Sequence, residues 1–289
     1  MKICLGTVQF GLNYGIDKKK IDIREIDEIL EKALIYKINI LDTAQNYGNS
    51  EELIGKYKDK GKFKIISKIS SSVLTNIDSL EELRRNLDIS LNKLCVKSLD
   101  GLLLHRADDL KNTIFFNNLN KLKEEGYFSK LGVSIYSVNE AEEALENKNI
   151  QYIQVPYNIL DTRLDKIKFF ERAKSMKKTI FVRSVFLQGA LLKEHSKYPK
   201  CLEELKKIDK LLEAEIQKLG CTKLEFLLNF VKNNKNIDYI VVGIEKLKDL
   251  EEIVEAYNFK GLENYNFEKI RENFINIPEN ILNPSLWKE

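Results

Sequence analysis

Four polar side chains in this sequence have the types and spacing needed to move a proton. Asp42, Lys68 and His105 each stand at the carboxyl end of a short apolar segment, and Tyr47 follows Asp42 by five positions. A lysine at the end of an apolar segment is costly to bury unless a carboxylate such as Asp42 pairs with it. Such pairing favours a group of four side chains that act together.

The chemistry that these residue types support is proton donation to an oxygen. A tyrosine hydroxyl with its ordinary pKa of about 10 is a poor acid at neutral pH, and a neighbouring ammonium is expected to lower the pKa of Tyr47 by favouring the phenolate. Lys68 would supply the ammonium, Asp42 would orient it, and His105 would hydrogen-bond a carbonyl oxygen. Since the group contains no obvious nucleophile and no cluster of metal ligands, a bound cofactor must supply the electrons.

Each residue taken singly also has a structural explanation. Asp42 could cap a helix, Tyr47 could be an amphipathic loop residue, and Lys68 could be a charge at the rim of the sheet. His105 could be a half-buried histidine whose hydrogen bonds are satisfied. The combination of the four is what points to a site.

Strands and helices alternate along the chain and would position these side chains. Short β-rich apolar segments alternate with longer segments whose apolar residues recur at helical spacing, such as the leucine stripe of 80–94. The predicted strands are Ile3–Leu5, Asn39–Leu41, Lys64–Ser67, Leu99–Leu104, Lys130–Val133, Gln151–Val155, Thr179–Val182 and Asp238–Val242. The predicted helices include Ile23–Tyr36, Leu80–Leu94, Thr113–Glu124, Asn139–Glu146, Leu164–Lys174 and Leu247–Tyr257.

Strand followed by helix, repeated eight times, predicts an α/β protein with a parallel sheet. An open doubly wound sheet stays an alternative, but the absence of a Gly-rich dinucleotide loop favours closure into a (β/α)8 TIM barrel. No linker divides the chain, so we expect one domain over residues 1–289, with longer connections at 184–203 and from Gly261 onward. In such a barrel the carboxyl ends of the strands meet at one mouth, which brings the four polar side chains together.

Composition excludes several other classes of function. The 289 residues carry 47 basic and 44 acidic side chains, spread along the chain, which is no electrostatic footprint for nucleic acid. The four cysteines lie far apart without a CxxC pair, so we expect neither a metal site nor a disulfide framework. No apolar run approaches the roughly 18 residues of a membrane span, and we expect a cytoplasmic protein without a membrane or nucleic-acid partner.

Residues 42–51 read DTAQNYGNSE and are followed by Gly55. This segment resembles the aldo-keto reductase signature DTAxxYGxSE…G at every fixed position. The resemblance continues in order along nearly the whole chain, through Leu5-Gly6-Thr7, Ser67-Lys68, Leu104-His105, Gly132-Val133-Ser134, Gln154, Tyr157-Asn158, Gly243 and Glu252.

The resemblance implies a reductase of aldehydes or ketones that uses a nicotinamide cofactor. It implies that Tyr47 is the general acid, that Lys68 and Asp42 tune it, and that His105 orients the carbonyl. It further implies that the cofactor contacts Thr7, Asp42, Ser134, Gln154, Arg183, Ser184, Leu187, Gly243 and Glu252. A monomer is the implied assembly, with an oligomer not excluded, and the opening LGTVQFGLNYG is similar to reductases of carbohydrate metabolism.

Three departures from the family pattern bear on the cofactor. Ile135 follows the carboxamide serine where asparagine is common, and Arg183 stands where an aromatic residue usually stacks on the nicotinamide. Asp249 stands where an arginine often binds the 2′-phosphate of NADPH, although Lys246 and Lys248 are near in sequence. NADPH is therefore the cofactor implied by the resemblance, and NADH is the alternative that Asp249 suggests.

Two rival functions remain on the sequence alone. One is a non-catalytic regulatory barrel that binds the nucleotide, against which the intact set of four polar residues argues. The other is a hydrolytic or isomerising barrel in which Asp42 and Glu51 act as paired carboxylates. For Glu51, in the first turn of a predicted helix, capping is the better explanation.

Overall fold

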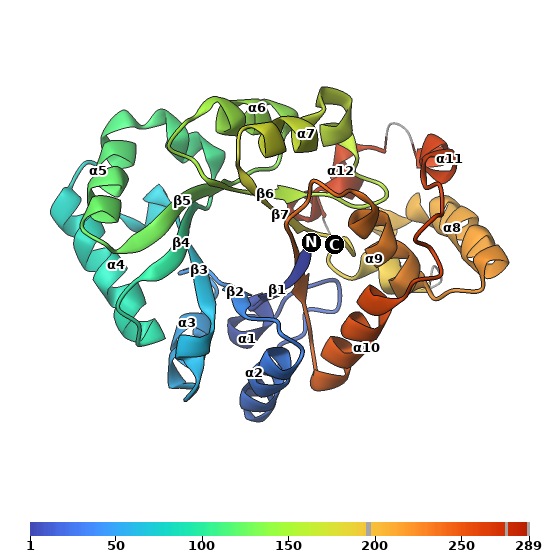
Figure 1. Cartoon of the computed structure of the whole chain (residues 1–289), viewed down its shortest axis with the longest axis horizontal. Helices are drawn as coiled ribbons and strands as arrows, with labels where there is room; N and C mark the ends of the chain where they lie inside the picture. Colours follow the sequence, from blue (N-terminus) through green and yellow to red (C-terminus); the bar gives the residue numbers. More distant parts are fainter. Residues whose placement is uncertain (195–197, 275–276, 288–289) are drawn as a thin grey trace.

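Eight parallel strands close into a barrel within the part of the chain that the structure describes. The structure is a computed structural model that describes residues 1–194, 198–274 and 277–287. The strands follow one another around the barrel in chain order, and the ring closes where β1 pairs with β8, with Leu5 beside Val242. Figure 1 shows this ring of strands with the helices outside it. The predicted single-domain (β/α)8 barrel is confirmed.

The strands are β1 (Lys2–Gly6), β2 (Ile40–Asp42), β3 (Lys64–Ile69), β4 (Leu99–Leu104), β5 (Phe128–Ser134), β6 (Tyr152–Pro156), β7 (Thr179–Arg183) and β8 (Tyr239–Gly243). The α-helices are α1 (Val8–Gly11), α2 (Ile26–Ile35), α3 (Ser50–Lys56), α4 (Leu80–Leu94), α5 (Thr113–Glu124), α6 (Val138–Glu146), α7 (Phe169–Ser175), α8 (Leu205–Leu219), α9 (Lys223–Asn233), α10 (Leu247–Asn258), α11 (Glu268–Arg271) and α12 (Glu279–Leu282). Short 3₁₀ turns are η1 (Ile23–Glu25), η2 (Lys60–Lys62), η3 (Ser71–Val73), η4 (Ala107–Lys111), η5 (Arg163–Ile167), η6 (Ala190–Leu192), η8 (Lys200–Leu202), η9 (Glu272–Phe274) and η10 (Pro284–Leu286).

The predicted and observed elements agree closely. β4, α4 and α5 have the predicted bounds. The predicted helix at 164–174 is instead divided into η5 and α7, because Lys168 between them has a left-handed backbone with φ 52°. Apolar periodicity reports which face is buried, so it continues across a single left-handed residue and cannot reveal it.

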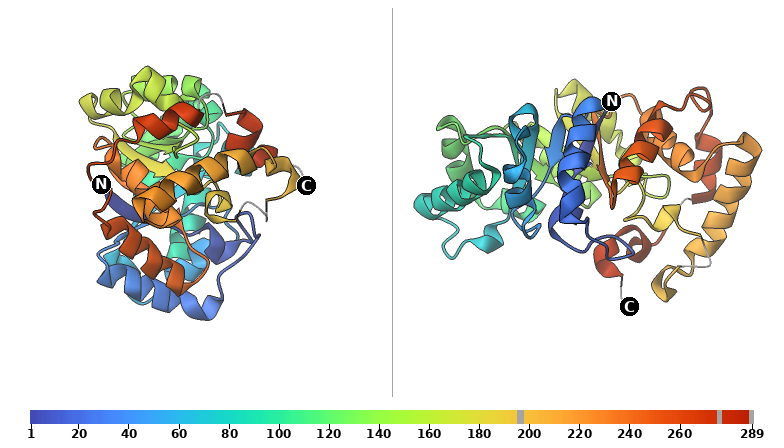
Figure 2. Two further views of the ribbon diagram at one scale, coloured as in Figure 1. Left: turned by 90° about the vertical axis from the view of Figure 1, so that its right-hand side faces the viewer. Right: turned by 90° about the horizontal axis from the view of Figure 1, so that it is seen from below.

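The inner face of the barrel is apolar in the layer that precedes the carboxyl ends of the strands. Cys4, Ile40, Ile66, Leu103 and Phe181 form a buried cluster there, and Tyr152, Tyr239 and Val241 pack against it. Figure 2 (right) shows the amino terminus and the red C-terminal segment at opposite ends of the barrel. The C-terminal segment therefore lies at the end where the strands finish.

Helix α4 shows how local sequence and packing combine. The Ser79 hydroxyl accepts the N–H of Glu82 and caps the helix, while Leu83 and Leu87 are buried on its inner face. Helix α3 packs closely against the end of α4 at Gly55, where a Cβ atom would lie 2.0 Å from the carbonyl oxygen of Lys93. Only a residue without a side chain allows this approach.

We therefore expect Gly55→Ala to lower the free energy of unfolding by about 2–3 kcal/mol, because the backbone of α4 must move away. Gly61→Ala is the matched control, since a Cβ there meets no atom within 4 Å. Urea unfolding of both variants checks this. A Gly55→Ala protein as stable as the wild type would show that the two helices do not approach so closely.

Candidate active site

The polar site is the layer directly above the apolar cluster on the inner face of the barrel. Alternate residues of a strand share a face, so Asp42 follows Ile40, Lys68 follows Ile66 and His105 follows Leu103 at a spacing of two. By the same spacing Gln154 follows Tyr152 and Arg183 follows Phe181. The change from an apolar to a polar layer puts these side chains at the mouth, on top of a filled core.

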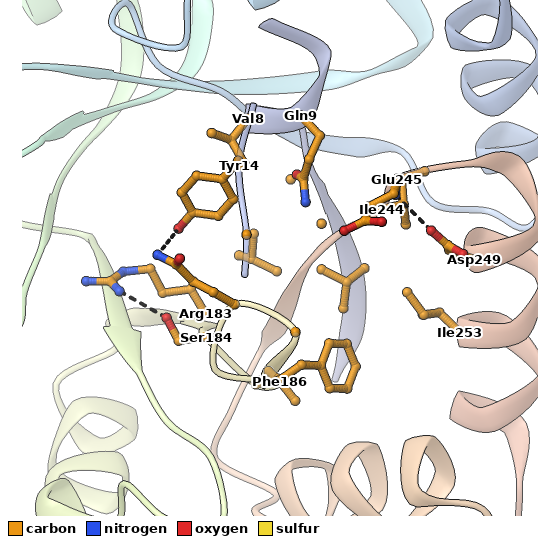
Figure 3. A pocket seen from close by; sticks show the side chains of 18 of the residues that line it. Val8, Gln9, Tyr14, Arg183, Ser184, Phe186, Ile244, Glu245, Asp249 and Ile253 are labelled. Atoms are coloured by element: carbon orange, nitrogen blue, oxygen red, sulfur yellow. Dashed lines mark hydrogen bonds between the residues drawn. The ribbon is translucent and has the colours of Figure 1, made fainter. Parts of the chain in front are cut away.

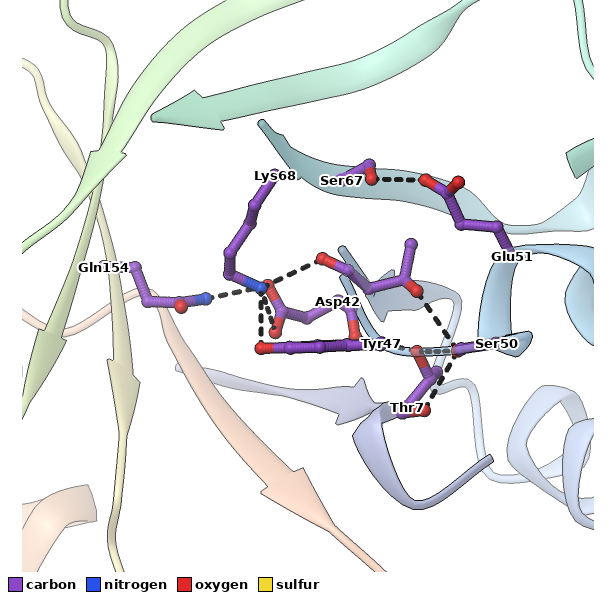
Figure 4. A network of polar contacts seen from close by, with 9 residues as sticks. Thr7, Asp42, Tyr47, Ser50, Glu51, Ser67, Lys68 and Gln154 are labelled. Carbon is purple, nitrogen blue, oxygen red and sulfur yellow. Dashed lines mark hydrogen bonds and ion pairs between the residues drawn. The ribbon is translucent and has the colours of Figure 1, made fainter. Parts of the chain in front are cut away.

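Lys68 and Asp42 form a buried ion pair at the centre of this layer (Figure 4). The Lys68 Nζ lies 2.7 Å from each carboxylate oxygen and also donates to the Thr43 carbonyl oxygen at 3.0 Å. The Lys68 side chain is 1% exposed and that of Asp42 is 5% exposed. A pair buried this deeply is maintained only when both ions keep good hydrogen bonds, as they do here.

Tyr47 lies beside this pair. The Lys68 Nζ donates to the Tyr47 hydroxyl oxygen at 3.5 Å, which leaves the phenolic proton free for another acceptor. Burial raises the pKa of Tyr47 and outweighs the opposite effect of the Lys68 ammonium. The net shift is thus opposite to the lowering expected from the ammonium alone. The hydroxyl stays protonated at neutral pH, as a proton donor must.

The Lys68 side chain keeps its positive charge in spite of its burial. Burial by itself lowers the pKa of Lys68, but Asp42 and Tyr47 together raise it above its ordinary value. Lys68 therefore stays charged at neutral pH.

His105 faces Tyr47 across the mouth. The two rings are 6.1 Å apart between centroids and nearly perpendicular, at 86°. Burial and the positive charges of Lys68, Arg183 and Arg106 lower the pKa of His105 to about 4. The imidazole is therefore neutral at physiological pH and can donate one N–H to a bound oxygen.

Further hydrogen bonds from neighbouring segments hold the ion pair in place. Gln154 donates from Nε2 to Asp42 Oδ1 at 2.8 Å, and the Thr7 hydroxyl donates to the Asp42 carbonyl oxygen at 3.1 Å. Ser50 in turn donates to the carbonyl oxygen of Thr7 at 2.9 Å. The orientation of Asp42 is thus determined by β1, β6 and the start of α3.

Glu51 takes no part in this site. It is 3% exposed, and its carboxylate accepts the hydroxyls of Ser67 and Ser90 behind β3. The capping role expected from its position is not seen; the glutamate instead ties α3 to β3 and α4. A catalytic pair of Asp42 and Glu51 has no support in this geometry.

A cavity of about 380 Å³, here called the β1/β8 cavity, runs from Asp42 and Tyr47 past the ends of β1 and β8 to the start of α10 (Figure 3). Among the side chains expected to contact a cofactor, those that line it are Thr7, Asp42, Gln154, Arg183, Ser184, Gly243 and Glu252. Ser134 and Leu187 do not line it; both are buried, at 2% and 0% exposure. The structure thus brings most of the expected residues to one cavity.

Gln9 is a cavity residue that the sequence patterns do not reveal. It is 7% exposed and its Oε1 has no hydrogen-bond partner among the described residues. Figure 3 shows its amide projecting into the cavity. Gly243 lies against it, since a Cβ there would be 2.8 Å from Gln9 Oε1. A buried amide without a partner is rare and marks a place where a ligand can supply the missing hydrogen bond.

Two loops meet over the β1/β8 cavity. The amide of Ile16, in the loop after β1, donates to the Gln188 carbonyl oxygen at 2.9 Å, and Gln188 Nε2 donates to the Tyr14 hydroxyl at 3.0 Å. Lys193 and Asp17 form an ion pair between the same loops. A ligand in the cavity would be partly covered by these contacts.

Arg183 occupies the wall between the mouth and this loop. Its guanidinium lies 4.2 Å from the centre of the Tyr136 ring and donates to the Ile135 carbonyl oxygen at 2.9 Å and to the Ser184 hydroxyl at 3.2 Å. These contacts hold the guanidinium in place, so its charge is a permanent part of the site.

A second cavity of about 480 Å³, here called the β3/β4 cavity, opens on the other side of the polar group. Lys68 and His105 line it together with Tyr136, and Asn283 and Ser285 from the C-terminal segment complete its wall. The weakly periodic stretch after Gly261 is therefore part of the site. Sequence periodicity could not indicate this, because η10 is too short to show a pattern.

Comparison with known proteins identifies the family. Residues 2–274 match the model of the aldo/keto reductase family. An aldo-keto reductase of Strobilurus tenacellus, str7, is 26% identical over 264 residues, which cover 81% of this chain and 76% of the relative. The NADH-specific methylglyoxal reductase of Escherichia coli is 27% identical over 165 residues, covering 48% and 50%.

Solved structures agree on the fold. The holo form of the aldo-keto reductase AKR11C1 from Bacillus halodurans has a TM-score of 0.70 at 20% identity and covers 93% of this chain and 91% of its own. This solved structure shares the closed barrel of this chain. The match over residues 2–274 shows that the chain belongs to the aldo/keto reductase family of oxidoreductases. The family's members use NAD(P)H.

Two further observations concern the described residues only. None of their helices has the length and apolar character needed to cross a membrane. Within the same residues, histidine, cysteine, aspartate and glutamate side chains form no group of three or more that could hold a metal ion.

The depressed pKa of His105 predicts a pH dependence of stability. In the unfolded chain histidine titrates near pH 6.5, whereas folded His105 titrates at about 4. Below about pH 6.5 the unfolded state binds the extra proton, so the free energy of unfolding decreases as the pH falls towards 4. His105→Gln should reduce that decrease, as measured by urea unfolding at pH 7, 5.5 and 4.5.

The imidazole can also be observed directly. His105 and His195 are the two histidines of the sequence, so NMR of a His195→Gln protein reports His105 alone. We expect no titration between pH 5 and 9. An imidazole that titrates near pH 6.5 would contradict the neutral, desolvated site.

Proposed function

We propose that this protein is an NAD(P)H-dependent reductase of small aldehydes or ketones, in which Tyr47 protonates the carbonyl oxygen. One observation carries the proposal. Asp42 and Tyr47 line the β1/β8 cavity, while Lys68 and His105 line the β3/β4 cavity. Lys68 contacts both Asp42 and Tyr47, so the polar group lies between the two cavities, and a cofactor in the first and a carbonyl compound in the second would lie on either side of it.

The residues of the β1/β8 cavity fit a dinucleotide. The Gln9 amide, whose Oε1 has no partner among the described residues, and the polar side chains of Gln154 and Ser184 can offer hydrogen bonds along its length. The lack of a side chain at Gly243 leaves room for the Gln9 amide, which projects into the same cavity. We assign cofactor binding to the expected residues that line this cavity, and to Gln9.

Bound there, the cofactor supplies a hydride to the carbonyl carbon. Tyr47 passes its proton to the oxygen, which gives the alcohol, and His105 donates a hydrogen bond that holds the oxygen in place. The Lys68 ammonium stabilises the phenolate left on Tyr47, which then regains a proton from solvent. Because burial disfavours that phenolate, a charged Lys68 is required for the transfer.

A non-catalytic nucleotide-binding barrel is the alternative function. It gives no reason for a buried ammonium directed at the Tyr47 hydroxyl, nor for a second cavity beside it. The experiment on Tyr47 distinguishes the two.

Tyr47→Phe removes the proton donor and little else. We expect kcat for carbonyl reduction to fall by about 10²–10⁴-fold, while the Kd for the cofactor changes less than about twofold. Steady-state assays with methylglyoxal, glyceraldehyde and an aromatic aldehyde, together with fluorescence titration of the cofactor, measure both. A variant that retains more than about a tenth of the wild-type kcat would remove Tyr47 from this role, and a wild type that binds cofactor but reduces no carbonyl would favour the regulatory barrel.

The far end of the β1/β8 cavity bears on the choice of cofactor. Glu245, Asp249 and Glu252 line it there, whereas Lys246 and Lys248 do not. The Asp249 carboxylate accepts the backbone N–H groups of Glu245 and Lys246 at 2.9 and 3.1 Å. These amides at the start of α10 are the groups that could otherwise bind a phosphate.

Both effects disfavour the 2′-phosphate of NADPH. A carboxylate already occupies the amides, and like charges near a partly exposed phosphate repel by on the order of 1 kcal/mol at an effective dielectric of about 20–80. An unphosphorylated ribose can instead donate its hydroxyls to a carboxylate. The E. coli relative named as NADH-specific is in keeping with this. We propose that the protein binds NADH at least as tightly as NADPH.

Asp249→Asn tests this choice while retaining a side chain that can cap α10. We expect its Kd for NADPH to fall by about fivefold at low salt, with little change for NADH, and the gain to shrink as salt is added. Glu255→Gln on the exposed face of α10 is the charge-matched control. The Kd of each protein is measured by titration with both cofactors, and a wild type that binds NADPH more tightly than NADH would contradict the proposal.

A further inference from the structure

The β3/β4 cavity is lined almost entirely by polar side chains. Val73 is its one aliphatic residue among the described part of the chain, and Tyr136 its one tyrosine. Apolar pockets bind through buried surface, whereas a polar pocket must exchange hydrogen bonds with water for hydrogen bonds with its ligand. The uncommitted polar groups of this wall therefore indicate what the ligand must offer.

Most charged groups of the wall already have partners. Lys68 is paired with Asp42, and Asp108 is paired with Lys111 at 3.1 Å. The Glu140 carboxylate accepts the backbone N–H groups of Tyr136 and Ser137 at the start of α6. These contacts satisfy the cavity's carboxylates internally.

Arg106 is the exception. Arg106 follows His105 directly, is exposed and lines the cavity, and its side chain has no salt bridge or hydrogen bond to another described residue. It is nevertheless near enough for its charge to contribute to the low pKa of His105. A guanidinium carries five N–H donors in a planar fork, which matches the oxygens of a carboxylate or a phosphate.

A second uncommitted group lies close to the reacting residues. Gln45 Nε2 donates to Asn86 at 2.7 Å, but its Oε1 is buried and has no partner among the described residues. An amide oxygen in this state needs an N–H or O–H donor.

We propose that the carbonyl compound reduced at this site carries an acidic group, a carboxylate or a phosphate, that Arg106 binds. The proposal rests on the proposed reductase function and names the substrate class for it. His105 and Arg106 are consecutive, so the carbonyl and the acidic group belong to one small molecule. Three positive charges, on Lys68, Arg183 and Arg106, act on the His105 imidazole. Because Lys68 is paired with Asp42, Arg106 is the charge left, among the described residues, to attract an anion to the β3/β4 cavity.

Matched substrate pairs test the inference. Succinic semialdehyde and butanal differ in a carboxylate, and glyceraldehyde 3-phosphate and glyceraldehyde differ in a phosphate. We expect the wild type to show a KM at least about tenfold lower for the anionic member of one pair or both, and the pair with the larger effect identifies the acidic group. Added salt should reduce the difference.

Variants of Arg106 test whether this residue causes the difference in KM between anionic and neutral substrates. Arg106→Gln should raise KM for the anionic substrate by about 10–100-fold with kcat changed less than threefold, and should alter the neutral partner much less. Arg106→Lys should recover part of the loss, because it restores the charge without the planar fork. Arg85→Gln on α4, an exposed arginine outside both cavities, is the charge-matched control and should behave as wild type.

A binding measurement separates this inference from the reductase proposal. Calorimetry with the alcohol products 4-hydroxybutyrate and glycerol 3-phosphate, in the presence of oxidised cofactor, should show binding to the wild type and a loss of at least tenfold in Arg106→Gln. If anionic and neutral members have equal KM, or if Arg106→Gln weakens both equally, the inference is wrong although the reductase function stands. If no carbonyl is reduced, the reductase proposal fails, and binding of both products unchanged by Arg106→Gln would overturn the inference too.

Discussion

The buried Lys68–Asp42 ion pair is the interaction on which the rest of the site depends. Taking an ammonium and a carboxylate out of water costs several kcal/mol per ion, and their attraction offsets this only in good geometry. Lys68 reaches both Asp42 oxygens, the Thr43 carbonyl and the Tyr47 hydroxyl, while Gln154 donates to Asp42 from the opposite side of the barrel. These partners come from three strands and a loop, so the ion pair is stable only when the barrel is closed and in register.

The alternation of side chains along the strands explains why the pair can exist at all. Ile40, Ile66, Leu103 and Phe181 fill the inner face below it, and the next inward positions are Asp42, Lys68, His105 and Arg183. The apolar layer excludes water from beneath, and the loops after β1 and β7 meet above the β1/β8 cavity. Electrostatic effects are therefore stronger here than at an open surface, which is evident in the pKa of about 4 for His105.

Charged residues line both cavities, and the two sets differ. The mouth is surrounded by Lys68, Arg183 and Arg106, while the start of α10 presents Glu245, Asp249 and Glu252. Arg106 is the cation of the β3/β4 cavity without a carboxylate partner among the described residues, which favours an acidic substrate there. At α10 the Asp249 carboxylate occupies the backbone amides, which favours an unphosphorylated ribose. The same physical argument underlies both proposals, although each depends on different residues.

The sequence by itself determined the barrel and its chemical residues. Periods of two and of about 3.6 residues are local properties of strands and helices, so they located β4, α4 and α5 correctly and put Asp42, Lys68 and His105 at strand ends. The burial, the pKa and the neighbours of these groups depend on the tertiary structure alone. Burial raised the pKa of Tyr47 instead of lowering it, and it left Gln9 Oε1 without a partner among the described residues. The packing of the barrel put Glu51 against Ser67 of β3, and it put Asn283 and Ser285 in the wall of the β3/β4 cavity. Desolvation and contact between distant segments depend on the packing of the whole barrel, and no local spacing encodes them.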